Sequence, residues 1–274
     1  RYRFHLSRNL SREKMRFQSY AFLKCSDWKR VKVFSDVFGA TSVALLTEFT
    51  VAEIKEMTHD QLVDLVNRRG RGHFADPPGT VRMVREALRS SYPIAPQTDE
   101  MVTAALATGW EHIRFIKRLM KRLDKHIARC IDPVPNPIIT VKGLGAVVTA
   151  GLLAEIVDVT RFPEHKHLAQ YSGLTWDKRA SGNFVSQNTR LTKAGSKYLR
   201  YYLIMGANTL RQFNLEYKAF YWRKHGEVAK YQHKRALVLT ARKLVRLVHA
   251  LLTKNVPYVR PRTLANVEED SSLQ

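Results

Sequence analysis

Cysteine is scarce in this chain of 274 residues, and so are the features of secreted and membrane proteins. Its two cysteines, Cys25 and Cys130, form no CxxC or Cys/His cluster, which argues against a disulfide framework and a zinc site. We expect both to be buried free thiols in a cytoplasmic, nucleoid-associated protein. The sequence shows no signal peptide and no apolar run long enough to cross a membrane. Strand patterns are weak except for a short hairpin near Trp176–Ser186, so the predicted fold is all-α for the most part.

Acidic residues are also few, since 24 Asp and Glu stand against 46 Lys and Arg, for a net charge of +22. Such a chain repels itself unless a polyanion neutralises it, so nucleic acid is the expected partner. An anionic membrane is the alternative, but it requires a basic amphipathic anchor or a long apolar run, and we find neither. Apolar residues make up 45% of the chain, which argues against disorder.

The first predicted domain, residues 1–132, is a helical arm with an inserted helical subdomain. Arg1–Lys24 has the pattern of a basic amphipathic helix, and capping boxes at Thr50 and Thr58 open two short helices. From Asp99 to Ile131 a heptad seam is flanked by basic residues, which fits either a helix packed on Arg1–Lys24 or a coiled-coil arm that forms a homo-oligomer. Both interpretations stay open here. The seam consists of Val102, Leu106, Gly109, Ile113, Ile116, Met120, Leu123, Ile127 and Cys130.

The second predicted domain, residues 133–262, begins at a linker in which Pro133, Pro135 and Pro137 alternate with other residues. An acidic tail, residues 263–274, is expected to be disordered. The helices predicted in this domain are Val147–Ile156, His165–Ser172, Lys193–Arg211, Leu215–His225 and Gln232–Leu252.

Two glycines precede the first of these helices. In Val141–Gly145, Gly143 and Gly145 allow close approach of a phosphate, Lys142 adds a charge, and the helix that follows directs N–H groups at the same anion. This predicts a helix-hairpin-helix that binds the DNA backbone without reading bases. The simpler alternative is an ordinary turn before a core helix.

A serine beside a glycine is the other chemical feature, because such a loop can present its hydroxyl to a phosphate. Ser181-Gly182 has cations on both sides, whereas Ser172-Gly173 is an equally good dipeptide on pattern alone. No His/Asp triad accompanies either serine, so esterase-type hydrolysis is not expected. We place Lys193, Lys197 and Arg200 on one helical face. The cations that could stabilise charge on a phosphate under attack are Lys178, Arg179, Arg190, Lys193, Lys197 and Arg200.

Several other residues have simpler explanations. The aromatic residues Tyr198, Tyr201, Tyr202, Phe220, Tyr221 and Trp222 could stack on bases but fit a helical core better. Glu155 and Asp158 could bind a metal ion, although a solvated face or a capping pair is the commoner role. We expect His249 to be structural, and Tyr171 lacks the basic framework of a tyrosine recombinase.

The order and spacing of motifs over Ile139–Leu203 resemble the transposase domain of the insertion-sequence family that includes the Piv invertase. The shared motifs are Gly143-Leu144-Gly145, Ala154-Glu155-Ile156 with Asp158, Arg161-Phe162, Leu168-Ala169, Tyr171, Gly173-Leu174, Ser181-Gly182, Thr192-Lys193, Gly195 and Leu199-Arg200. The resemblance implies that Ser181, not Ser172, is the nucleophile that cleaves and rejoins DNA. It also implies a RuvC-like domain whose four acidic residues hold Mg²⁺, and a guide RNA.

The chain begins at Arg1, not at a methionine, and no early strand carries a catalytic Asp. We therefore expect it to be the portion after the acidic domain, with no metal of its own and no activity alone. The expected partners are element-end and target DNA, a guide RNA and a second copy of the chain, but no membrane. One alternative is a non-catalytic helix-hairpin-helix protein that binds DNA or RNA. A base-excision glycosylase that uses Asp158 is the other.

Overall fold

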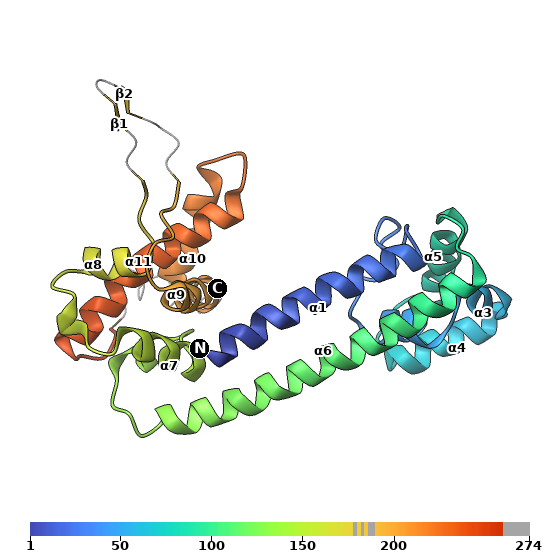
Figure 1. Ribbon diagram of the computed structural model, residues 1–274, viewed down its shortest axis with the longest axis horizontal. Helices are drawn as coiled ribbons and strands as arrows, with labels where there is room; N and C mark the ends of the chain where they lie inside the picture. The colour runs from blue at the N-terminus through green and yellow to red at the C-terminus, as the bar shows by residue number, and fades with distance from the viewer. Residues whose placement is uncertain (178–179, 182–183, 186–189, 260–274) are drawn as a thin grey trace, which may run out of the picture. The chain divides into compact units, whose positions relative to one another are not determined.

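A computed structural model describes residues 1–177, 180–181, 184–185 and 190–259 (Figure 1). The chain forms two compact units: one is Tyr2–Lys121, and the other comprises Arg122 onward together with Arg1. Within the described ranges, regular structure is helical apart from two strands of two residues each, which confirms the all-α prediction. The predicted boundary after residue 132 lies at the end of a helix, α6 (Pro96–Ile131), whereas the units divide inside that helix.

The unit formed by Tyr2–Lys121, here the arm unit, packs short helices between two long ones. Its helices are α1 (Tyr2–Lys24), α2 (Ala40–Glu48), α3 (Val51–Glu56), α4 (His59–Gly70), α5 (Pro77–Ser90) and the first part of α6. Thr50 and Thr58 both form the predicted capping boxes, with Glu53 and Gln61 as their partners. The core joins Phe17 and Ala21 of α1 to Val102 and Leu106 of α6, so the two helices pack together in this unit.

The heptad seam is buried only in its first half. Val102, Leu106, Ile113 and Ile116 are buried, while Cys130 near the C-terminal end of α6 is exposed. The prediction that both cysteines are buried is therefore right for Cys25 and wrong for Cys130, which lies beyond the part of α6 that packs into this core.

The last residue of α1, Lys24, is a buried lysine. The ammonium group of Lys24 donates to the carbonyl oxygens of Leu46 (2.8 Å) and Phe49 and to Oγ1 of Thr103 (2.7 Å). These carbonyls lie at the C-terminal end of α2, where a positive charge is favourable. Burial nevertheless lowers the pKa of Lys24 from 10.5 to about 8.

The other unit, here the hairpin unit, contains every candidate site residue. Its elements are η1 (Pro137–Thr140), α7 (Ala146–Ile156), η2 (Val159–Arg161), α8 (His165–Tyr171), β1 (Ala180–Ser181), β2 (Phe184–Val185), α9 (Lys197–Phe213), α10 (Leu215–Gly226) and α11 (Gln232–Lys254). The core is formed by α7, α8, α9 and α11, with Leu152, Leu168, Leu203 and Leu244 fully buried. β1 pairs antiparallel with β2, which confirms the short hairpin.

One predicted helix begins at the wrong residue. The helix expected over Lys193–Arg211 starts at Lys197, because Lys193 and Gly195 both have positive φ angles, 52° and 79°. Ser196 then caps the helix by accepting a hydrogen bond from the Leu199 amide. Lys193 therefore lies in the loop before α9, and it does not share a helical face with Lys197 and Arg200 as predicted.

Candidate functional site

The glycine turn leads directly into α7. Leu144 N–H donates to Val141 O (2.9 Å), and Gly145 is the N-cap of the helix. A side chain at Gly145 would meet no atom within 4 Å, so the first turn of α7 is open to a phosphate, with exposed Lys142 nearby in the sequence. Gly143 differs: its φ is 106°, and a Cβ there would contact Leu210 and Phe213 at 3.4 Å. The four-residue η1 precedes this turn, so the helix-hairpin-helix remains a prediction.

The hairpin that carries Ser181 stands on a paired stem. Ser181 lies in β1, and its backbone pairs with Phe184. Below it, Asp177 N–H donates to Arg190 O and Thr192 N–H to Thr175 O, both at 2.9 Å. Trp176 and Leu191 face each other across this stem as an isolated bridge. Lys178, Arg179 and Gly182 lie outside the described residues, whereas Arg190 and Lys193 are exposed on the stem and the loop after it.

Arg200 holds the loop that follows the stem. Its Nη1 donates to the carbonyl oxygens of Ser172 (2.9 Å) and Lys193 (3.0 Å), so the guanidinium is occupied by backbone. Lys197, by contrast, is exposed at the start of α9. The hydroxyl of Ser172 is buried and donates to Ala169 O (2.8 Å), which leaves it unsuited to attack an outside phosphate.

Glu155 has a structural position that its sequence did not reveal. It is buried on α7, where it accepts from Ser196 Oγ and from Arg1 Nε, both at 2.9 Å. The expectation of a solvated face is therefore wrong for Glu155, whereas Asp158 caps η2 as expected, with Thr160 lowering its pKa. His249 bonds to Phe162 O (2.8 Å), as expected for a structural histidine.

The aromatic residues only partly follow the prediction that they belong to the core. Tyr202 and Tyr221 are buried, but Trp222 is 55% exposed.

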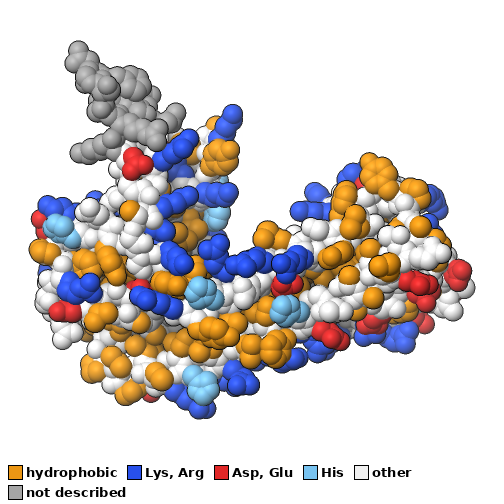
Figure 2. Space-filling model, viewed as in Figure 1, with side chains coloured by type: hydrophobic (Ala, Val, Ile, Leu, Met, Phe, Trp, Pro, Cys, Tyr) orange, Lys and Arg blue, Asp and Glu red, His pale blue; other side chains and the backbone are white. Residues whose placement is uncertain are grey.

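A basic groove, which the sequence analysis missed, lies between the hairpin stem, α10 and α11. It consists of two neighbouring hollows that share Trp176 and Leu239. Lys and Arg side chains are dense beside the stem and over the α10–α11 turn (Figure 2). We call this surface the α11 groove; its lining is Thr175, Trp176, Asp177, Arg190, Leu191, Lys193, Phe220, Arg223, Val228, Lys230, Tyr231, Lys234, Arg235, Val238, Leu239, Arg242, Lys243 and Arg246.

Two of the groove cations are already paired with acidic side chains. Lys243 binds Glu216 (2.6 Å) and Arg235 binds Glu227 (3.0 Å). Among the described residues, no ion pair involves the remaining groove cations. These are Arg190, Lys193, Arg223, Lys230, Lys234, Arg242 and Arg246. Asp177 is the one acidic residue of the lining, so the groove is strongly positive.

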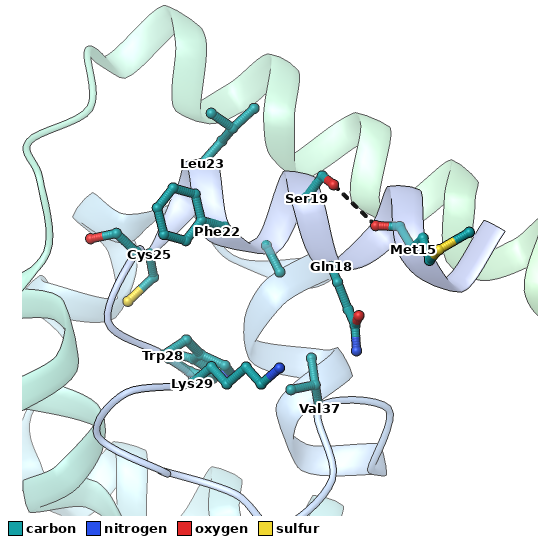
Figure 3. A pocket seen from close by; sticks show the side chains of 11 residues that line it. Met15, Gln18, Ser19, Phe22, Leu23, Cys25, Trp28, Lys29 and Val37 are labelled. Carbon is teal, nitrogen blue, oxygen red and sulfur yellow. Dashed lines mark hydrogen bonds between the residues drawn. The ribbon is translucent and has the colours of Figure 1, made fainter. Parts of the chain in front are cut away.

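The arm unit has a different hollow, which is mostly apolar. Met15, Phe22 and Leu23 of α1 line it together with Trp28 and Val37 (Figure 3). The three α1 side chains are more than half exposed, although each is large and apolar. An exposed apolar patch of this kind marks a surface that other molecules can cover.

The described residues contain no group of three or more His, Cys, Asp or Glu that could hold a metal ion. No described helix is long and apolar enough to cross a membrane.

Part of the chain is similar to a family of known proteins and to several individual relatives. Residues 136–222, which include the glycine turn, Ser181 and Arg200, match the family described as "Transposase IS116/IS110/IS902 family". Over 155 residues the chain is 28% identical to the pilin gene-inverting proteins of Moraxella bovis and Moraxella lacunata, covering 54% of this chain and 48% of each relative. Over 187 residues it is 25% identical to the "Insertion element IS110 uncharacterized 43.6 kDa protein" of Streptomyces coelicolor, covering 67% and 44%. The chain thus spans about half the length of the curated relatives it matches.

Proposed function

We propose that this chain is the part of a DNA transposase or site-specific recombinase that binds DNA and supplies the serine nucleophile. The observation that carries the proposal is the match of residues 136–222 to a transposase family, since that segment contains both the glycine turn and the Ser181 hairpin. The net charge of +22 fits a polyanionic substrate.

The proposed reaction is phosphoryl transfer. The Oγ of Ser181 gives up its proton and attacks a phosphorus atom of the DNA backbone, the bond from phosphorus to the leaving strand oxygen breaks, and that oxygen takes up a proton. Attack by the hydroxyl of another strand on the serine–DNA phosphodiester reverses the step and rejoins the DNA. Cations near the phosphate would stabilise the charge that develops during both steps.

The described cations have different parts in this proposal. Arg190 and Lys193 are exposed next to the hairpin stem, so their charges are available to a phosphate. Arg200 acts indirectly, because its guanidinium holds the backbone of the loop that carries Lys193. We assign Arg200 as a positioning residue, in place of the direct electrostatic role predicted for it.

Activation of the serine is proposed to come from outside the described residues. An unperturbed hydroxyl is a poor nucleophile, and Lys and Arg are poor bases at neutral pH. The family resemblance implies a RuvC-like acidic domain that holds Mg²⁺ and a guide RNA that selects the DNA. We propose both for the complete protein. Self-association through the helical arm is proposed as well, supported by the exposed apolar side chains Met15, Phe22 and Leu23.

The test is capture of the covalent intermediate. The complete protein is incubated with element-end DNA, guide RNA and Mg²⁺, the reaction is stopped with denaturant, and the protein–DNA adduct is digested and mapped by mass spectrometry. The proposal predicts a phosphodiester on Ser181. A non-catalytic DNA-binding protein would give binding with no adduct, and an adduct on another residue would contradict the assignment of the nucleophile.

A further inference from the structure

The α11 groove has the length and spacing of a strand-binding surface. Lys234, Val238, Arg242 and Arg246 recur every four residues along α11, so they share one side of the helix, and Tyr231 is the N-cap residue that precedes it. From Lys234 to Arg246 this face is about 18 Å long. Nucleotides of one strand in a duplex are about 3.4 Å apart, and at this spacing several nucleotides fit along the face.

The charges along this face repel one another and have little compensation. Burial lowers the pKa of Arg242, and the charge of Arg246 lowers it further. His165 experiences the same field, because its pKa is lowered first by burial and then by Arg242, Arg246 and His249. Arg242 Nη1 and His165 Nδ1 are the two buried side-chain polar atoms without a hydrogen-bond partner in the described part of the chain. An anion seated in the groove would relieve this repulsion.

Aromatic side chains lie among these cations. Trp176 is half-buried and lines both hollows of the groove, and Tyr231 is 79% exposed at the start of α11. Unstacked bases bind to such aromatic faces, with the backbone following a positive groove. The bases of a duplex are already stacked on each other and cannot reach these rings. The combination therefore favours a single strand.

We propose that the α11 groove binds a single strand of nucleic acid, with phosphates on Arg242 and Arg246 and bases stacked on Trp176 and Tyr231. This inference rests on the proposed function, and it adds the surface that holds an unpaired strand beside the serine hairpin. Trp176 connects the α11 groove to the hairpin that carries Ser181, because it lines the groove and belongs to the stem below β1. In Figure 1 the hairpin stem and the α10–α11 turn project from the same side of the unit.

Fluorescence anisotropy with this 274-residue chain tests the proposal. The probes are labelled 15-nucleotide single strands of DNA and of RNA with the same sequence, and the matching DNA duplex. The variants are Arg242→Gln, Arg246→Gln and Trp176→Ala. Lys218→Gln and Lys254→Gln are matched controls for the two arginine variants, because each removes one positive charge. Both lysines are exposed on α10 and α11 outside the groove.

We expect each groove variant to weaken single-strand binding about tenfold, and each control less than twofold. Arg242→Gln and Arg246→Gln should each reduce the log–log salt slope by about 0.7. Trp176→Ala should leave this slope unchanged, because it removes stacking and no charge. Arg246 is exposed, so its variant remains informative if Arg242→Gln does not fold.

Three outcomes decide the matter. Selective loss with the groove variants supports the proposal, and the tighter of the DNA and RNA arms identifies the natural strand. If the chain binds nucleic acid but groove and control variants lose affinity equally, the groove assignment is overturned and the proposed function stands. If the unmodified chain binds none of the probes, both fail.

Discussion

Arg200 of α9 donates a hydrogen bond of 2.9 Å to the carbonyl oxygen of Ser172, the residue that ends α8. The same nitrogen donates to Lys193 O (3.0 Å), so one guanidinium holds the end of α8 and the loop before α9 together. Gly173 has a φ of 65°, and a Cβ there would clash with the backbone oxygen of Ala194, which explains why a glycine stands there. The hydrogen bond from Arg200 of α9 thus holds the backbone of the loop that carries Lys193.

Replacement of Arg200 should therefore lower stability as well as activity. Arg200→Gln removes hydrogen bonds from a charged donor, and we expect a loss of about 2 kcal/mol in the free energy of unfolding. Lys197→Gln, on the exposed first turn of α9, should change it by less than about 0.5 kcal/mol. Chemical denaturation followed by circular dichroism measures both values. Equal stability of the two variants would mean that Arg200 does not hold the loop.

The two glycines of the turn before α7 should respond differently to substitution. Gly145→Val places a side chain in open space at the start of α7, so it should weaken DNA binding while the fold survives. Gly143→Val should destabilise the fold itself by about 1–3 kcal/mol, because valine is strained at a φ of 106°. Anisotropy with duplex DNA, after a circular dichroism check, measures the first effect. Unchanged affinity for Gly145→Val would show that this glycine only makes a turn.

Lys24 should make stability depend on pH in the alkaline range. Its folded pKa is about 8 against 10.5 for the exposed group, so the unfolded chain binds more protons between these values. The free energy of unfolding should therefore rise with pH across this window, by at most about 3 kcal/mol. Lys24→Met should abolish this rise. Urea denaturation at pH 7.5 and pH 10 compares the two chains, and an equal rise in both would refute the assignment.

The chain by itself should bind DNA or RNA but should not cleave DNA. The reason is that its described residues contain no group of three or more His, Cys, Asp or Glu that could hold Mg²⁺, and an unactivated serine hydroxyl is a poor nucleophile. Incubation with element-end DNA, guide RNA and Mg²⁺, followed by a denaturing gel, should show intact strands, and cleavage should appear once the acidic domain is joined. A covalent adduct formed by this chain alone would show that the acidic domain is dispensable.

The sequence predicted local structure well because its signals are local. The capping boxes at Thr50 and Thr58 each involve residues within one stretch of four, so the sequence pattern predicts them directly. The helices α7, α8, α10 and α11 have nearly the predicted bounds. The start of α9 was missed, because a left-handed Lys193 cannot be recognised from a pattern of apolar residues.

The site was harder to predict because its contacts are distant in sequence. Glu155 and Ser196 are 41 residues apart, and their hydrogen bond buries a carboxylate that the helical pattern placed in solvent. The α11 groove likewise joins Trp176 to Arg242 across the fold. The spacing of Lys234, Arg242 and Arg246 on one face of α11 was visible in the sequence. Nothing in the sequence showed that the hairpin stem and α10 would line the other side of this groove.

The central claim is that Ser181 is the nucleophile of DNA strand exchange, and strand exchange by the complete protein measures it most directly. Donor and target DNA are incubated with guide RNA and Mg²⁺, and recombinant product is quantified for the unmodified protein, Ser181→Ala and Ser172→Ala, with DNA affinity measured in parallel. We predict that Ser181→Ala binds DNA normally but forms no product. Ser172→Ala should recombine at nearly the normal rate, because the hydroxyl that it removes is buried and donates to Ala169 O. Recombination by Ser181→Ala at the rate of the unmodified protein would contradict the claim.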